Sequence, residues 1–231
     1  MSNQLPKFRL NKFLAERLGV SRREADELIS VGKITVDDQL ANIGARIDKN
    51  NKVCYNKKIV PFETEYLYLA FHKPIDCVCS RRAQGATPTL YDLLPDQYRK
   101  LKTVGRLDKD SSGLILLTND GDFAFRMTHP RFRKTKVYEI ELDHPLTPLH
   151  QQMITDYGVV LDDGLSRFKV ITAAGSNRRT HFIVILTEGR NRQIRRTFAT
   201  LGYKVIKLHR THFGPYELGD LKPGEYAIIK P

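Results

Sequence analysis

Apolar residues near the N-terminus recur at helical spacing in two short segments. The first, over residues 10–18, is followed at once by Gly19, and a glycine in this position is typical of a helix C-terminus. The second starts with the capping box Ser21–Glu24, in which the serine caps the helix and the glutamate reaches back. Residues Lys33–Val36 then alternate like a strand. The pattern predicts a small self-contained α/β module over residues 9–52.

The chain becomes richer in predicted strands from residue 67 onward. Apolar and polar positions alternate at Val137–Leu142 and His181–Thr187, and the other strand candidates are Leu67–His72, Val205–Leu208 and Tyr226–Ile229. A short apolar run predicts a buried strand at Leu114–Leu117, and helical spacing predicts helices at Asp122–Thr128, Pro148–Tyr157 and Arg192–Leu201. Strands mixed with few helices indicate an α+β fold with a mainly antiparallel sheet. The predicted organisation is a module with the start of a linker (1–60), a linker (61–66) and a larger domain (67–231).

Charge narrows the choice of partner. The chain of 231 residues has 38 Lys and Arg against 26 Asp and Glu, a net charge of +12. Such an excess on a soluble domain favours a polyanion, most often a nucleic acid. Basic residues of the N-terminal module gather at helix starts and ends, where free backbone N–H groups also attract phosphate. We expect this cluster to contact RNA rather than merely to form a solvated face. Its members are Arg9, Lys12, Arg22, Arg23 and Lys33.

Several classes of protein are disfavoured by what the sequence does not contain. No stretch approaches the roughly 20 apolar residues of a membrane span, and the N-terminus lacks an apolar signal core. The odd number of cysteines (Cys54, Cys77, Cys79) suits a reducing cytoplasm. There is no dinucleotide fingerprint, no phosphate-binding loop and no convincing set of metal ligands. We therefore expect a cytoplasmic protein without metal or cofactor.

Asp108 is the first candidate for chemistry. It lies in the segment Gly105-Arg-Leu-Asp-Lys109, which leads directly into the buried strand. A polar loop on a rigid strand can hold a reactive side chain at a fixed place. Most loop aspartates are only solvated, but the neighbouring cations favour the ionised form that a nucleophile or base requires.

Two further segments carry candidate residues. Four arginines lie within Glu188–Arg196, here called the arginine segment, and they are Arg190, Arg192, Arg195 and Arg196. Arg195 borders the apolar stripe of the predicted helix, so its guanidinium group would reach into a cleft. The other three arginines suit contacts with phosphate. Lys136 and Tyr138 share one face of a predicted strand. Tyr138 fits either a stacking platform for a base or a place in the core.

Taken in order, these segments resemble one family. Gly-Arg-Leu-Asp-x-x-[Ser/Thr]-x-Gly-Leu-x-Leu-Leu-Thr-Asn-Asp-Gly at 105–121 is similar to the signature of RsuA-type ribosomal RNA pseudouridine synthases. His72-Lys-Pro74, Lys136-x-Tyr138 and the arginine segment match the same family in order. Asp76 stands where the family often has glycine. Residues 8–50, through Ser-Arg-Arg-Glu-Ala and Gly-Lys-Ile-Thr-Val-Asp, resemble the S-four-type RNA-binding fold that usually precedes it.

The resemblance implies isomerisation of a specific uridine in ribosomal RNA to pseudouridine, with base flipping, and we expect the protein to be a monomer. It implies that Asp108 is the catalytic aspartate, acting as nucleophile or base, and that Tyr138 stacks on the uracil. Arg195 would pair with the aspartate, and Arg106 would fill the gap left by the flipped base. Lys136, Arg190, Arg192 and Arg196 would bind substrate. The alternatives are a non-catalytic RNA-binding or ribosome-assembly factor, or a synthase acting on tRNA. A methyltransferase is disfavoured by the missing glycine-rich loop.

Overall fold

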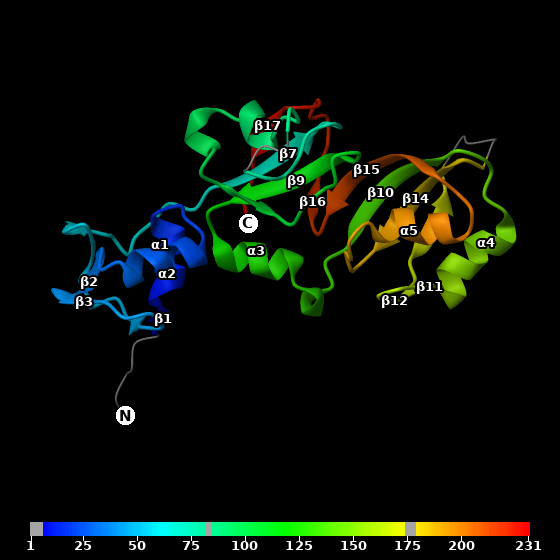
Figure 1. The fold of residues 1–231 in the computed structure, drawn as a ribbon. Helices are drawn as coiled ribbons and strands as arrows, with labels where there is room; N and C mark the ends of the chain where they lie inside the picture. Colours follow the sequence, from blue (N-terminus) through cyan, green and yellow to red (C-terminus); the bar gives the residue numbers. More distant parts are fainter. Residues whose placement is uncertain (1–6, 82–84, 174–178) are drawn as a thin grey trace. The chain divides into compact units, whose positions relative to one another are not determined.

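A computed structural model describes residues 7–81, 85–173 and 179–231 (Figure 1). The chain forms two compact units, Met1–Leu67 with Asn119–Gly121, and Tyr68–Thr118 with Asp122–Pro231. The fold is α+β as predicted, with a small unit of helices and short strands and a larger unit built on one mainly antiparallel sheet. No described helix has the length and apolar character needed to span a membrane.

The first unit packs two helices against short strands. The elements are β1 (Phe8–Arg9), α1 (Leu10–Arg17), α2 (Arg22–Ser30), β2 (Ile34–Val36), β3 (Gln39–Leu40), β4 (Arg46–Ile47), β5 (Val53–Tyr55) and β6 (Lys58–Ile59). The predicted capping box is confirmed: the Ser21 hydroxyl accepts from the Glu24 amide at 3.1 Å, and the Glu24 carboxylate accepts from the Ser21 amide at 2.6 Å. Leu10, Leu14 and Ile34 are fully buried in the core between these elements.

The start of the segment predicted as a linker packs against α1. Arg17 donates to the carbonyl oxygens of Pro61 and Phe62 at 3.2 and 2.5 Å. The Phe62 ring lies 4.4 Å from the ring of Phe13. These contacts extend the core of the first unit beyond β6.

The second unit is built on a sheet with the strand order β13-β14-β10-β15-β9-β7-β17 (Figure 1). Its strands are β7 (Tyr68–Lys73), β8 (Lys102–Val104), β9 (Ser112–Thr118), β10 (Lys136–Leu142), β13 (Lys169–Thr172), β14 (His181–Leu186), β15 (Val205–Phe213), β16 (Tyr216–Glu217) and β17 (Tyr226–Ile228). Its helices are α3 (Gly121–Thr128), α4 (Pro148–Gln152), which continues as the π-helical turn η4 (Met153–Tyr157), and α5 (Gln193–Thr200). Short 3-10 turns are η1 (Leu90–Leu93), η2 (Asp96–Tyr98) and η3 (Pro130–Phe132), and a separate hairpin joins β11 (Val159–Leu161) to β12 (Gly164–Ser166).

The two halves of this sheet meet where β9 runs parallel to β15. The contact is short, pairing His209 with Ser112 and Arg210 with Gly113. Gly113 has a φ of +106°, and a Cβ placed there would lie 2.2 Å from the backbone oxygen of Arg210. Glycine is therefore required at 113 both by the backbone conformation and by the close approach of the neighbouring strand.

A β-bulge re-aims side chains beside this junction. Strand β15 continues five residues beyond the predicted Val205–Leu208 strand, to Phe213. Its register with β10 shifts between Val137 and Tyr138, so that Lys136 lies opposite Phe213 and Tyr138 lies opposite Arg210. Bulges of this kind commonly redirect side chains near functional sites.

Candidate active site

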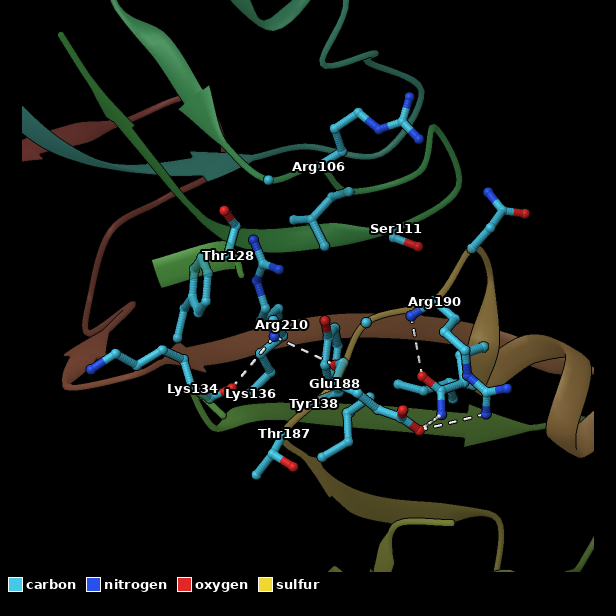
Figure 2. A pocket seen from close by; sticks show the side chains of 18 of the residues that line it. Arg106, Ser111, Thr128, Lys134, Lys136, Tyr138, Thr187, Glu188, Arg190 and Arg210 are labelled. Atoms are coloured by element: carbon cyan, nitrogen blue, oxygen red, sulfur yellow. Dashed lines mark hydrogen bonds and ion pairs between the residues drawn. The ribbon is translucent and has the colours of Figure 1, made fainter. Parts of the chain in front are cut away.

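A cavity of about 340 Å³ lies at the junction of the two half-sheets (Figure 2). Four stretches of chain contribute to its lining: the loop before β9, the end of α3 with the segment after it, the first residues of β10, and the arginine segment. Arg210 and Phe213 of β15 line it as well. A volume in this range is typical of pockets for small ligands.

Asp108 lies in the loop Gly105–Ser111, here called the aspartate loop, and lines the cavity. Its side chain is 35% exposed, and its Oδ2 atom lies 3.5 Å from Nη1 of Arg192. Arg192 also donates to both carboxylate oxygens of Asp110, at 3.1 and 3.0 Å. One guanidinium thus joins two carboxylates of the aspartate loop to the arginine segment.

The backbone of Arg192 has a φ of +46°, in the left-handed region. The predicted helix therefore begins one residue later, at Gln193. A non-glycine residue in this conformation is strained by about 1 kcal/mol or more and persists only where tertiary contacts hold it. The ion pairs with the aspartate loop are such contacts.

Arg195 does not occupy the place expected from the sequence. Its ion pair within the described chain is with Asp110, at 3.2 Å, rather than with Asp108. Its two amino groups donate to the backbone oxygens of Asp110 and Val205 at 2.7 and 2.6 Å. The side chain runs from α5 to the aspartate loop and β15, so it reaches the carboxylate two residues after Asp108.

Asp110 is the residue of this loop that sequence reasoning missed. Burial alone would raise the pKa of its carboxyl, but the hydrogen bond from Arg192 and the charges of Arg195 and Arg192 outweigh burial and hold the pKa below its usual value. The carboxylate stays ionised and binds both arginines. The sequence signal that could have identified Asp110 was its position two residues after Asp108, in a chain with an arginine-rich helix to pair with it.

The other two arginines of the segment fold the hairpin β11–β12 against it. Arg190 and Arg196 form ion pairs with the two carboxylate oxygens of Asp163, at 2.9 and 2.7 Å. Arg190 also lines the cavity and donates to Gly164 and Leu165 carbonyl oxygens. Their charges, expected to meet phosphate, are thus partly neutralised within the chain.

Arg106, Lys136 and Tyr138 all line the cavity. Arg106 is exposed, and Figure 2 shows its side chain extending outward at the rim. Tyr138 is 8% exposed and faces Arg210, whose guanidinium carbon lies 6.0 Å from the tyrosine ring centre. The predicted common face of Lys136 and Tyr138 is confirmed.

Lys136 is a partly buried cation whose protonation depends on folding. Burial, with a further contribution from the charge of Arg210, lowers the pKa of Lys136 from 10.5 to about 8. Its Nζ atom donates to the carbonyl oxygens of Lys134 and Glu188, both at 3.4 Å. These long bonds compensate only partly for the water that the ammonium group loses.

This lowered pKa predicts a pH-dependent stability. Between about pH 8 and 10.5 the unfolded chain binds more protons at Lys136 than the folded chain, so the free energy of unfolding rises with pH across this window. We expect the free energy of unfolding of the wild type to rise by about 2 kcal/mol relative to that of Lys136→Met between these limits. This is less than the full pKa shift implies, because the side chain keeps some hydration. Urea unfolding at pH 7 to 10.5 measures this; equal pH slopes would contradict it.

Lys73 stabilises the end of the aspartate loop through buried hydrogen bonds. It is fully buried, and its Nζ atom donates to the carbonyl oxygens of Pro74 and Ser111 at 2.8 and 2.7 Å. Burial lowers the pKa of Lys73. Asp76 adopts a left-handed conformation with a φ of +56°, and its amide donates to the Lys109 carbonyl oxygen at 2.9 Å. Aspartate tolerates this conformation better than most residues, so the turn forms without glycine.

The basic cluster of the N-terminal module lies largely on the surface. Arg9, Arg22, Arg23 and Lys33 are exposed, and Lys12 is partly buried. Arg22 and Arg23 are the first two residues of α2, as predicted. Among the described residues of the whole chain, no group of three or more His, Cys, Asp or Glu side chains is placed to hold a metal ion.

The fold, the aspartate loop and the arginine segment define the class of this protein. The chain belongs to the RNA pseudouridylate synthase family, whose profile matches residues 67–200, and a profile of the S4 domain matches residues 8–53. The protein is a pseudouridine synthase, an isomerase, with an N-terminal S4 domain.

Particular relatives cover nearly the whole chain. It is 35% identical to ribosomal small subunit pseudouridine synthase A of Pasteurella multocida, over 96% of this chain and 95% of the relative. It is 30% identical to ribosomal large subunit pseudouridine synthase B of Bacillus subtilis, over 96% of this chain and 92% of the relative. A crystal structure of a pseudouridylate synthase superposes with a TM-score of 0.68 at 29% identity, covering 96% of each chain.

Proposed function

We propose that this protein isomerises a specific uridine of ribosomal RNA to pseudouridine, with the uridine flipped out of its stack into the cavity and Asp108 as the catalytic carboxylate. The relatives that carry ribosomal subunit names support the choice of RNA. The observation that carries the proposal is the cavity itself, which gathers Asp108 from one half of the sheet and Tyr138 from the other. We propose that the protein acts as a cytoplasmic monomer and needs no cofactor.

The reaction suits the groups in the cavity. Isomerisation breaks the glycosidic bond, turns the uracil and rejoins it through carbon 5, so no atoms enter or leave. Asp108 acts as a nucleophile or as a base, and its Oδ2 atom lies 3.5 Å from a guanidinium nitrogen of Arg192 at the edge of the arginine segment. Extracting a nucleotide costs a few kcal/mol, which phosphate contacts and stacking on Tyr138 would offset.

The positions of the remaining residues support the roles that we propose for them. Arg106, exposed at the rim, fills the gap that the flipped base leaves. Arg192, Arg190, Arg196 and Lys136 hold the RNA around the cavity. Arg195 acts as a positioning residue, because it holds Asp110 and with it the aspartate loop.

The test is a map of pseudouridines in total RNA from cells with and without the gene. We expect one site, or a small set of sites, to disappear from ribosomal RNA and to return when the purified protein acts on that RNA. If a pseudouridine disappears from tRNA instead, the substrate is tRNA and not ribosomal RNA. No change in any RNA would favour a non-catalytic binding or assembly factor.

The N-terminal cluster predicts a salt-dependent contribution to affinity. Replacing Arg22 and Arg23 together with glutamine should weaken RNA binding about tenfold and reduce the slope of log K against log salt by roughly 1.5 to 2 units. Filter binding at several salt concentrations measures both. Lys57→Gln with Lys58→Gln, two exposed cations of the same unit, is the matched control. Equal effects in both double variants would show that only net charge matters.

A further inference from the structure

Arg210 is a buried cation that lines the cavity. The residue is 2% exposed, and Figure 2 shows its side chain extending from β15 into the pocket. Its Nε atom donates to the carbonyl oxygen of Leu114 at 2.7 Å, which fixes the guanidinium plane on the neighbouring strand. Within the described residues, its Nη2 atom has no hydrogen-bond partner.

The surroundings of Arg210 do not neutralise it. Its guanidinium carbon lies 4.8 Å from the ring centre of Phe213 and 6.0 Å from that of Tyr138. Lys136, a second cation, is close enough for Arg210 to disfavour its charge. Arg210 forms no ion pair with a carboxylate in the part of the chain that the structure describes.

A purely structural role explains this arrangement poorly. A buried charge is costly unless it is paired and fully hydrogen-bonded, and apolar residues of similar volume usually fill such a place with equal or better stability. The bulge in β15 brings Arg210 opposite Tyr138. The β9–β15 contact fixes its backbone against Gly113. The guanidinium is therefore held rigidly, with an unused donor, beside the proposed stacking platform.

We propose that the guanidinium of Arg210 donates a hydrogen bond to a carbonyl oxygen of the uracil in the cavity and stabilises the negative charge that develops there. This inference rests on the proposed function. When the C1′–N1 bond breaks, its electron pair remains on the uracil and is shared by N1 and the carbonyl oxygens. Carbon 5 then bonds to C1′ and loses its proton, and N1 gains one. If Asp108 instead adds to the ring, the charge again falls on a carbonyl oxygen.

The test uses the full chain and an RNA fragment that contains the mapped uridine. Arg210→Gln removes the charge and should lower the single-turnover rate about a hundredfold, as loss of one such donor does in other enzymes. Lys207→Gln removes an exposed charge from the same strand and should leave the rate unchanged. A folded Arg210→Gln variant with a rate within about threefold of wild-type would overturn the proposal.

A second arm separates a base contact from a phosphate contact. With an abasic residue in place of the uridine, wild-type and Arg210→Gln should bind the RNA equally, whereas the variant should bind the uridine RNA more weakly. Equal losses on both RNAs would make Arg210 a phosphate ligand and overturn the proposal.

If Arg210→Gln does not fold, Arg210→Lys keeps the buried charge and a donor for Leu114 but loses the outer amino groups. Its rate should fall about tenfold or more, and a wild-type rate would overturn the proposal. An inactive wild-type protein would instead count against the proposed function.

Discussion

Asp108→Asn is expected to lower the rate of isomerisation by about a thousandfold or more while RNA affinity changes by less than about threefold. The substitution removes the charge that a nucleophile or base needs and keeps the size of the side chain. The surroundings should remain in place, because Asp110 alone makes two hydrogen bonds to Arg192. Pseudouridine formation in the mapped RNA and filter binding measure the two quantities.

The matched control for this variant is Asp220→Asn, which makes the same change at an exposed position of the same unit. It should retain wild-type turnover. If Asp108→Asn also turned over normally, Asp108 would not be the catalytic group. If it lost affinity and activity in parallel, the role of Asp108 would be to organise RNA binding through Arg192.

Gly113→Ala should have the largest effect on stability, lowering the free energy of unfolding by about 4 kcal/mol or more. The new Cβ would lie 2.2 Å from the oxygen and 2.6 Å from the nitrogen of the Arg210 backbone, where no flexible side chain can move aside. Relief requires separating β9 from β15. Because the cavity lies at this junction, activity should be lost together with stability.

Gly202→Ala separates backbone strain from the clash. Gly202 also has a positive φ, +89°, but nothing lies within 4 Å of a Cβ placed there. Its cost should therefore be about 1 kcal/mol, the strain of a non-glycine residue in this region. Thermal and urea unfolding compare the two variants. Similar losses in both would show that the close approach at Gly113 relaxes at little cost.

Local pattern predicted much of the fold because each element obeys its own periodicity. The alternation over Val137–Leu142 and His181–Thr187 found β10 and β14 to within one residue. The strand that contains Arg210 was predicted too short, because His209, Arg210, Thr211 and His212 read as a polar run. These side chains are accommodated by neighbouring strands on both sides and by the bulge, which are tertiary features that no local pattern reveals.

The candidate site was predicted as a set of segments rather than as a set of contacts. Asp108, Tyr138 and Lys136 do share a cavity. The resemblance pairs Arg195 with Asp108, whereas the structure pairs it with Asp110, because a matching motif gives the order of residues but not how far an arginine side chain reaches. Asp110 and Arg210 were missed, since their partners lie about 80 or more positions away in the chain.

The position of β15 also sets an order for assembly during synthesis. The pair β7–β9 and the pair β10–β14 each form from segments that leave the ribosome before residue 205, but the strand that joins the two pairs is β15. Asp108 and Tyr138 therefore stay on unconnected pieces until a late strand inserts between them. We expect the nascent chain to acquire its cavity only after β15 has been synthesised, in a slow step dominated by long-range pairing.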